Sequence, residues 1–477
     1  MARGRVQFLS RDEILRTDET SVRILEEVGV DVLSPSAREL LLESGATISK
    51  TNDRILIPEE IVKSALSMAP KSIVLAGRNG AKDLRIPSEG GTYVANGGEG
   101  VFVKDLVTGE KRPSTGDDLR DFAILVEASP QVDFCWMMVG ALDKPAHLKN
   151  LIELKTCLEA TRKHVQTMAA SAQDARNMIK LASILSEGSQ EAPKRTIFSA
   201  VQCPISPLRF ERGIVEAQIE FARSGIPVVS MVASVAGLTS PVTLSGTLAQ
   251  VNAENLASLV ISQTAHKGAP WIYSSDSAAG NLRTGSIHYG AFETQLLRAG
   301  AGQLGRYYGV PTMVAGISLE GTSLTLSTVQ QGVPLMAIQA LVDSDLGSGF
   351  GGIEQAAGAS FEQFLVDAWV WEAARGFARE FDFDKDAISY ETIKDAGLDG
   401  NFLGKRHTIA RFRTEAMATI DRDAVLAGEP ATGSPGDLIK KAHREARRIL
   451  SKPTTLAASP EEIEEMNALV KKLNRAG

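Results

Sequence analysis

The sequence predicts an α/β fold: a (β/α)₈ barrel with an N-terminal helical and β-rich cap and with C-terminal helices. Residues 226–276 have the pattern of a strand, a helix and a second strand, and this alternation runs from about residue 115 to residue 380. That length is close to the ~250 residues of a typical barrel of this kind. The alternative, a doubly wound open sheet, is disfavoured because no GxGxxG or GxxxxGK[ST] motif follows a predicted strand.

The clearest strand–helix–strand unit lies between Ile226 and Asp276. Its first apolar run, 227–233, is short and rich in β-branched residues, which favours a buried strand. A helix is expected to begin at Ser240 and Pro241, since serine caps free N–H groups and proline suits the first helical position. Trp271–Ser275 follows as the next strand, so the two strands should be parallel with a right-handed crossover.

The other elements are expected at regular intervals on both sides of this unit. Strands are predicted at 132–139, 163–169, 196–202, 310–316 and about 341–346, with 101–106 as a weak first strand. Helices are predicted at 117–128, 145–161, 172–186, 208–224, 291–308, 324–341 and about 356–380. The chain therefore divides into a cap at 1–95, a barrel at 96–380 and a helical extension at 381–477.

Composition narrows the class of protein. The net charge of −7 argues against nucleic-acid binding, which needs clustered lysine and arginine. No apolar run has the length of a signal-peptide core or of a membrane span. Cys135, Cys157 and Cys203 form neither a CxxC pair nor a zinc spacing, which is typical of free thiols in a reducing compartment. We expect a cytoplasmic protein with no membrane partner, and the long C-terminal helices favour a homo-oligomer.

The expected reactive face is the rim formed by the C-terminal ends of the strands. It shows no HxH pair, no lysine placed for a Schiff base and no Ser–His–Asp order, which disfavours a metal- or Schiff-base-dependent lyase. Aromatic residues are expected there instead, and their faces can enclose a quaternary ammonium, although packing is the alternative for each. They are Phe134, Trp136, Trp271, Tyr273, Tyr289 and Phe350. Arg283, His288 or the helix start at Ser240 could hold a carboxylate.

Several long motifs resemble the trimethylamine methyltransferase superfamily. They are GGEGVFVKDLVTGEKRPST near the start of the barrel, CPISPLRFE at 203–211, TSPVTLSGTLAQVNAENLA, and RTGSIHYG followed by QLGRYYGVPTMVAG. The resemblance extends from about residue 20 to residue 380. It implies a (β/α)₈ barrel that passes a methyl group from a methylated amine to the Co(I) corrinoid of a separate small protein.

One segment departs from the pattern of the archaeal trimethylamine enzymes, which carry pyrrolysine there. Residues 316–321 read GISLEG, all standard residues. The chain therefore resembles the non-pyrrolysine branch, whose known members demethylate betaines such as glycine betaine. The alternatives are a demethylase of trimethylamine or another methylamine without pyrrolysine, and a non-catalytic betaine-binding barrel.

A quaternary ammonium already has a good leaving group, so the protein has only to align substrate and acceptor and to exclude water. We therefore predict no catalytic side chain, no metal site and no tightly bound cofactor, the corrinoid coming with its partner protein. The substrate-binding residues would be the aromatic set, Arg283 and His288. Glu99 and Glu320 could attract the ammonium, with a turn-capping carboxylate as the alternative.

Overall fold

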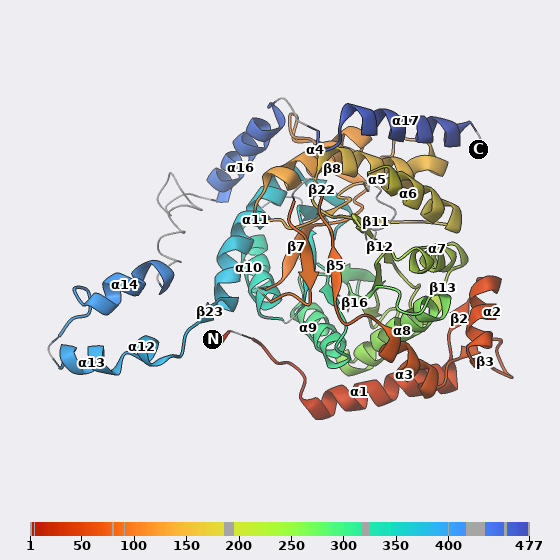
Figure 1. Ribbon diagram of the computed structural model, residues 1–477, viewed down its shortest axis with the longest axis horizontal. Helices are drawn as coiled ribbons and strands as arrows, with labels where there is room; N and C mark the ends of the chain where they lie inside the picture. The colour runs from red at the N-terminus through yellow and green to blue at the C-terminus, as the bar shows by residue number, and fades with distance from the viewer. Residues whose placement is uncertain are drawn as a thin grey trace.

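Eight parallel strands form a nearly closed barrel with helices around it, which confirms the predicted fold (Figure 1). The computed structural model describes residues 2–3, 5–78, 81–89, 91–185, 195–316, 325–342, 344–398, 400–415, 435–452 and 456–475. The barrel strands, in their order around the sheet, are β10 (Cys135–Trp136), β11 (Val165–Met168), β12 (Phe198–Gln202), β14 (Val228–Val232), β16 (Trp271–Ser275), β19 (Thr312–Val314), β20 (Leu346–Phe350) and β7 (Tyr93–Asn96). A parallel bridge between Ala95 and Phe134 connects β7 to β10 and closes the ring.

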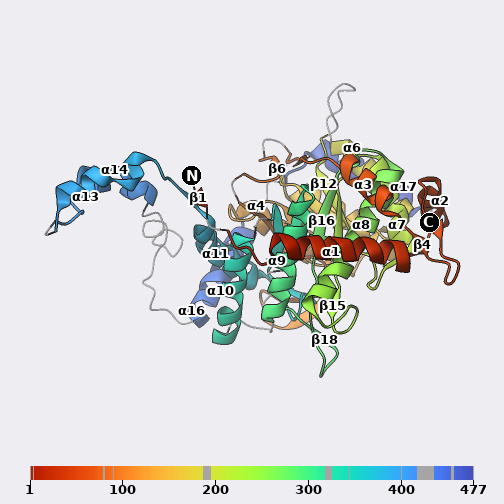
Figure 2. The ribbon, with the colours of Figure 1, turned by 90° about the horizontal axis from the view of Figure 1, so that it is seen from below.

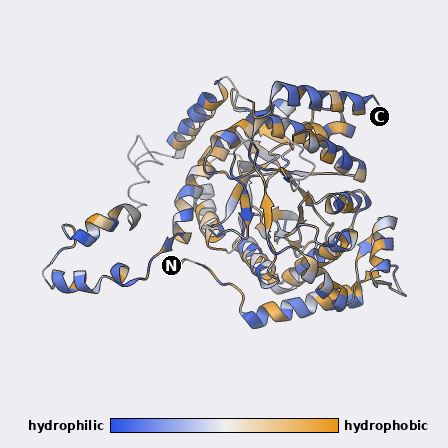
Figure 3. Cartoon of the chain, viewed as in Figure 1, coloured by the Kyte–Doolittle hydropathy of each residue, from blue (hydrophilic) through white to orange (hydrophobic). Residues whose placement is uncertain are grey.

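The helices of the barrel follow their strands as the sequence predicts. They are α4 (Gly116–Ala128), α5 (Lys149–Ala160), α6 (Ala172–Leu185), α7 (Arg212–Arg223), α8 (Leu244–Ala265), α9 (Phe292–Tyr307), α10 (Leu326–Leu341) and α11 (Phe361–Arg375). Figure 3 shows the hydrophobic residues of the strands gathered in the centre, with helices of mixed polarity outside. Parallel strands covered by helices in this way are buried on both faces.

The first barrel strand differs from the prediction. It is β7, at Tyr93–Asn96, and not the segment 101–106. The latter contains β8 (Phe102–Lys104), which joins a small sheet with β9 (Lys111–Pro113), β21 (Gly352–Ile353) and β22 (Gly358–Ser360). Both segments are short and apolar, so only the pairing partners distinguish them. The last strand, β20, also begins where the predicted strand ends, at residue 346. The division into three domains stays a prediction.

Helix α8 begins at Leu244, after Thr243, and not at Ser240 and Pro241 as predicted. The reason is a turn before the helix: Gly237 donates to the carbonyl of Ser240, and the Ser240 and Thr247 hydroxyls lie 2.9 Å apart. Almost every residue of α8 is buried, because α1, α2 and α3 cover its outer side.

The N-terminal segment covers the barrel in two places. Helices α1 (Arg11–Arg23), α2 (Pro35–Glu43) and α3 (Glu59–Met68) pack against α8. Serine caps begin α1 and α2: Ser10 accepts from the backbone of Glu13, and Ser34 from that of Ala37. The hairpin of β5 (Ile73–Leu75) and β6 (Leu84–Ile86) covers the N-terminal end of the barrel. Its apolar side chains pack with interior residues such as Val229 and Met313.

Strand alternation divides the barrel residues into two sets. Phe134, Val201, Val229, Met231, Ile272, Met313 and Leu346 form one apolar cluster inside the barrel with the β5–β6 hairpin. Their sequence neighbours Phe198, Ala200, Val228, Trp271 and Tyr273 belong to the larger core between the strands and the helices. Successive residues of a strand point to opposite faces, so register decides which side chains reach the interior.

The C-terminal segment has two parts. Helix α16 (Pro435–Leu450) packs on α11 and α4, and α17 (Pro460–Asn474) packs on α5 and α6. Between α11 and α16, the short strand β23 (Glu380–Phe381) pairs with β1 (Ala2–Arg3), and helices α12 (Lys385–Ile388), α13 (Tyr390–Ala396) and α14 (Arg406–Glu415) extend away from the barrel (Figures 1 and 2). No helix of the described residues has the length and apolar character needed to cross a membrane.

Substitution of Leu75 tests the hairpin at the N-terminal end of the barrel. Leu75 is fully buried among interior residues, whereas its neighbour Val74 is 37% exposed. Leu75→Ala should lower the free energy of unfolding by about 2–4 kcal/mol, because it removes buried methyl groups and leaves a cavity. Val74→Ala on the same strand should cost about 0.5 kcal/mol or less. Urea unfolding measures both, and equal effects would contradict the packing described here.

Candidate functional site

The loops after the barrel strands gather at one end of the barrel, which we call the mouth. In Figure 2 the mouth is marked by β15 (Val235–Ala236) and β18 (Ser286–His288), which project beyond the barrel on the side opposite β6. Together with β17 (Ala278–Asn281) these strands form a three-stranded sheet after β14 and β16. Catalytic and binding side chains of such barrels lie at this end.

A buried ion pair lies at the mouth. Asp276 follows β16 directly, and one of its oxygens accepts from Nη2 of Arg298 at 2.8 Å. The Arg298 side chain is 2% exposed and that of Asp276 24% exposed. Nη1 of Arg298 donates to the carbonyl of Gly316, at the end of β19, where a Cβ would overlap with the guanidinium. The ion pair therefore connects the ends of two strands through helix α9.

Tyr289 completes this group. Its hydroxyl donates to the second oxygen of Asp276 at 3.3 Å, and the guanidinium of Arg298 lies 5.2 Å from the centre of its ring. The Asp276 carboxylate and burial raise the pKa of Tyr289, so its hydroxyl stays protonated. Burial also raises the pKa of Asp276, while Arg298 and the Tyr289 hydrogen bond oppose this effect.

A second carboxyl group, that of Glu99, belongs to the same region. Glu99 lies in the loop after β7 with a left-handed φ of 64°, and its backbone N–H donates to the carbonyl of Met137. Its Oε1 is buried without a hydrogen-bond partner, and burial raises its pKa to about 7. The charges of Glu99 and Asp276 both act on the thiol of Cys203 after β12, whose pKa burial raises to about 12. Glu153 also raises the pKa of Glu99 and Lys149 lowers it, so the Lys149–Glu153 ion pair acts on the same carboxyl group.

Further polar atoms inside the barrel are buried without protein partners. They are Nε1 of Trp136, both amide atoms of Gln166 and the hydroxyl oxygen of Ser274. Trp136 and Gln166 are in register on neighbouring strands, and the same alternation places Ser274 on the interior face with Met231. Buried polar groups are normally hydrogen-bonded, so orphaned groups in one interior indicate a place for a polar ligand or water. Gly98 brings the backbone against the Trp136 indole, where a Cβ would overlap with the ring.

Comparison with known proteins identifies the family of this chain. The sequence profile of the trimethylamine methyltransferase family (MTTB) matches residues 2–477. The chain belongs to this family.

Three relatives illustrate the range of this family. The chain is 28% identical over 445 residues to the trimethylamine methyltransferase MttB of Desulfitobacterium hafniense (strain DSM 10664 / DCB-2), covering 93% of this chain and 89% of the relative. It is 26% identical over 479 residues to trimethylamine methyltransferase MttB of Methanosarcina barkeri, covering 99% and 96%. It is 26% identical over 410 residues to the glycine betaine methyltransferase of Desulfitobacterium hafniense (strain Y51), covering 86% and 85%. The chain is therefore a methyltransferase.

Among solved structures, the hydroxylamine complex of MtmB matches with a TM-score of 0.50 and 12% identity, covering 98% of this chain and 92% of that chain. At this identity the likeness supports the barrel fold alone.

Three of the predicted aromatic residues of this methyltransferase do not reach the interior, which corrects the prediction. Trp271 and Tyr273 lie on the helical side of β16, where the Trp271 Nε1 donates to Ser258 and the Tyr273 hydroxyl donates to Asn252, both on α8. Phe350 packs at 6.1 Å from the ring of Trp371 on α11. These three side chains stabilise the wall of the barrel.

Phe134, Trp136 and Tyr289 remain as aromatic candidates. Phe134 is fully buried within the interior cluster, Trp136 contacts the same cluster nearer the mouth, and Tyr289 lies beside Asp276. The predicted cage is therefore smaller than the sequence indicated, and it stays a prediction.

The predicted charged residues lie at different depths. Arg283 is exposed in the turn between β17 and β18, whereas His288 is half-buried on β18. Glu320 lies outside the described residues. Ser240 lies in the turn before helix α8, and its hydroxyl shares a hydrogen bond with that of Thr247 in the helix.

Arg298, Asp276 and Gln166 are the site residues that the sequence analysis did not select. Asp276 directly follows a predicted strand, a position that would have identified it. Gln166 lies within the predicted strand 163–169, where only the register shows that it faces the interior. Arg298 lies in the middle of a helix, where an arginine is usually solvated, so only its burial reveals it.

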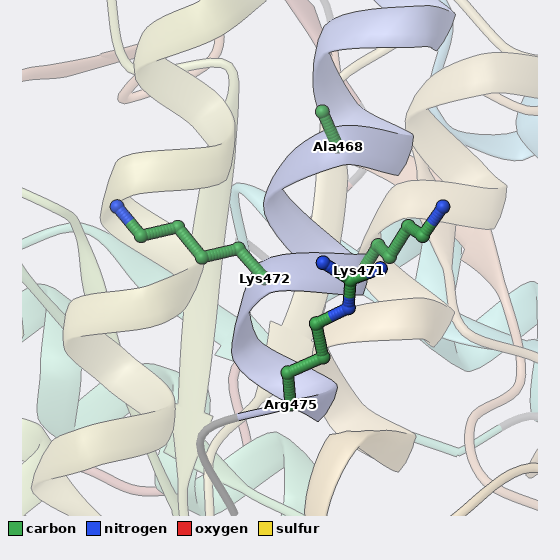
Figure 4. A pocket seen from close by; sticks show the side chains of 4 residues that line it. All are labelled: Ala468, Lys471, Lys472 and Arg475. Atoms are coloured by element: carbon green, nitrogen blue, oxygen red, sulfur yellow. The ribbon is translucent and has the colours of Figure 1, made fainter.

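One surface hollow lies outside this site. A surface hollow on α17 is bordered by Ala468, Lys471, Lys472 and Arg475. The long side chains of the two lysines and the arginine point in different directions (Figure 4). Helix α17 packs on α5 and α6, so this hollow lies on the outer wall of the barrel and away from the mouth. In the part of the chain that the structure describes, no three His, Cys, Asp or Glu side chains are grouped to hold a metal ion.

Removal of Arg298 tests the buried ion pair. Arg298→Met should lower the free energy of unfolding at pH 8 by about 3 kcal/mol, because it leaves the Asp276 carboxylate without its cation. Asp276→Asn together with Arg298→Met should recover most of this loss, since no unpaired charge is then left. Urea unfolding of the two single variants and the double variant provides the measurement. Additive effects of the two substitutions would contradict the pairing.

Proposed function

We propose that this methyltransferase transfers a methyl group from a quaternary amine, most simply glycine betaine or a related betaine, to the Co(I) corrinoid of a partner protein. The observation that carries the proposal is the carboxyl group of Glu99, one oxygen of which is buried without a hydrogen-bond partner, next in sequence to Gly98, whose backbone lies against the indole of Trp136. The glycine betaine methyltransferase among the relatives supports the substrate class. The standard residues at 316–321 support a reaction without pyrrolysine.

Electrostatics favour a cationic ligand at this mouth. The Asp276 carboxyl group is paired with the buried guanidinium of Arg298, whereas the buried oxygen of Glu99 has no hydrogen-bond partner. A cation bound beside Glu99 restores the balance of charge and lowers the cost of ionising this carboxyl group. A neutral amine receives no such benefit.

The trimethylated nitrogen cannot donate a hydrogen bond, so its recognition depends on charge and on aromatic faces. Trp136 offers a half-buried indole held against the backbone of Gly98, and Tyr289 offers a second ring. An ammonium over an aromatic face gains about 2 kcal/mol when both are desolvated. These contacts would fix the direction of the reacting N–CH₃ bond.

The carboxylate of a betaine needs a donor on the other side of the site. His288 remains the candidate from the sequence, because Arg283 is exposed at the turn. The orphaned amide of Gln166 is an additional donor inside the barrel. Both groups have N–H donors that can bind a carboxylate.

The chemistry assigns the protein a positioning role. Loss of methyl from a quaternary ammonium gives a neutral tertiary amine, so no protein acid has to protonate the leaving group. The corrinoid, brought by its partner, supplies the nucleophile that accepts the methyl group. The chain has to hold the substrate in line, exclude water and leave the mouth open to the partner.

The second candidate function is demethylation of trimethylamine or another methylamine without pyrrolysine, which the names of several relatives favour. A substrate comparison separates the two. Purified enzyme is supplied with Co(I) cobalamin and either glycine betaine or trimethylamine, and methyl–cobalt absorbance is followed. We expect turnover with the betaine at least about tenfold above that with trimethylamine, and the reverse order would select the second function.

The raised pKa of Glu99 predicts a pH dependence. Below about pH 7 the Glu99 carboxyl group binds a proton and is neutral, and above it the carboxylate attracts the ammonium. The dissociation constant of glycine betaine should therefore fall as pH rises from 6 to 8, by at most about tenfold per pH unit. In Glu99→Gln the constant should stay near its value at pH 6. Isothermal titration with an affinity independent of pH in the wild type would contradict this role.

The aromatic contact is tested by two matched substitutions. Trp136→Leu should weaken binding of glycine betaine about tenfold or more, because it removes the indole face. Phe350→Leu removes an aromatic ring of the same barrel that faces α11, so it should change stability but not affinity. Equal affinities of the two variants in isothermal titration would remove the aromatic contact from the proposal.

A further inference from the structure

Residues 379–415, which we call the arm, leave the barrel wall after α11. They contain β23, α12, α13 and α14, and in both ribbon views they lie beside the barrel and away from its helices (Figures 1 and 2). The arm is connected to the barrel at its base, where β23 pairs with β1.

The arm has no core of its own. None of its side chains whose burial the structure describes is buried. Its helices have 4, 7 and 10 residues. Isolated helices below roughly 12–15 residues are marginal in water and depend on packing for their stability.

Polar contacts within the arm do not replace that packing. Lys405 lies 2.6 Å from Asp395, and Arg411 lies 3.6 Å from Asp384, in ion pairs that water reaches. His407 contacts the carbonyl of Asp386 at 3.1 Å. Exposed pairs of this kind contribute about 0–1 kcal/mol each.

The arm instead presents a large apolar surface. Ten aromatic or aliphatic side chains on it are 42% exposed or more. They are Phe381, Phe383, Ile388, Tyr390, Ile393, Leu398, Phe402, Leu403, Ile409 and Phe412. Together they amount to on the order of 1,000 Å² of apolar surface, above the 300–600 Å² of the largest patch on a typical monomer. Phe377, just before the arm in sequence, is also exposed.

We propose that the arm packs against a second copy of this chain. The exposed apolar area meets the ~800 Å² per partner of a stable protein interface. The arm also carries seven basic and eight acidic residues between 379 and 415, so it can pair with an identical surface without net repulsion. This inference does not depend on the proposed methyl transfer.

Two other occupants fit less well. A corrinoid partner has to reach the mouth, whereas the arm extends sideways from beside β1, away from β15 and β18 (Figure 2). An anionic membrane surface would favour an excess of basic residues on the polar side of the helices, which the balanced charge of the arm does not provide.

The experiment is the mass of the full chain, measured by size-exclusion chromatography with light scattering over a dilution series. The arm variant is the triple substitution Phe383→Glu, Ile393→Glu and Leu403→Glu. The control is Val107→Glu, since Val107 is an apolar residue 80% exposed on the barrel. Wild type and control should assemble to a dimer or a higher multiple, and the arm variant should dissociate with a dissociation constant raised about a hundredfold or more.

Two results would overturn the proposal: a wild type that is monomeric throughout, or an arm variant that assembles as tightly as the control. Hydrogen exchange of the wild type provides a measurement without substitution, because the amides of residues 385–412 should be protected when the chain is concentrated and lose protection on dilution. Absence of protection at high concentration would also overturn it. If the arm variant keeps the mass of the wild type but transfers methyl groups poorly to a protein-bound corrinoid, the arm binds the corrinoid protein instead.

Discussion

A closed barrel allows each strand residue to face either the interior or the surrounding helices, and this constraint determines the rest of the structure. The interior set is apolar near the β5–β6 hairpin and polar near the mouth, where Trp136, Gln166 and Ser274 lie. The other set, including Trp271 and Tyr273, packs against α8. The same alternation therefore supplies the stability of the wall and the polarity of the site.

Burial gives the mouth its electrostatic character. Arg298 reaches from α9 to Asp276 and to Gly316, so the segments after β16 and β19 are held to α9 by one side chain. Glu99 has no comparable partner for its buried oxygen, and its carboxyl group titrates near neutrality. The mouth therefore holds one carboxyl group paired with an arginine, Asp276, and one whose buried oxygen has no hydrogen-bond partner, Glu99. This arrangement differs from a metal-binding cluster and from a catalytic triad. This difference is the basis of our proposal that the mouth binds a positively charged molecule.

The architecture could be predicted from the sequence because its signals are local. The barrel helices and most of the short apolar strands occur at the predicted places. The first barrel strand could not be assigned, because β7 and β8 have the same local character and differ only in their distant partners.

The site was predictable in part. Trp136 was selected from a predicted strand, Tyr289 from a loop and Glu99 from a glycine-rich segment, and these residues lie at or near the mouth. Trp271, Tyr273 and Phe350 were also selected but point to the helices, since a shift of one residue along a strand reverses the direction of a side chain. Arg298 carries no local signal, because its role depends on the depth of α9 against the barrel.

Pairing of β1 with β23 has a practical consequence for handling the protein. It places the start of the chain next to the base of the arm, whereas the chain ends after α17 on the opposite side of the barrel (Figure 1). An affinity tag at residue 1 would therefore emerge beside the surface that we assign to self-association. Attachment through the C-terminus leaves that surface free for immobilisation or labelling.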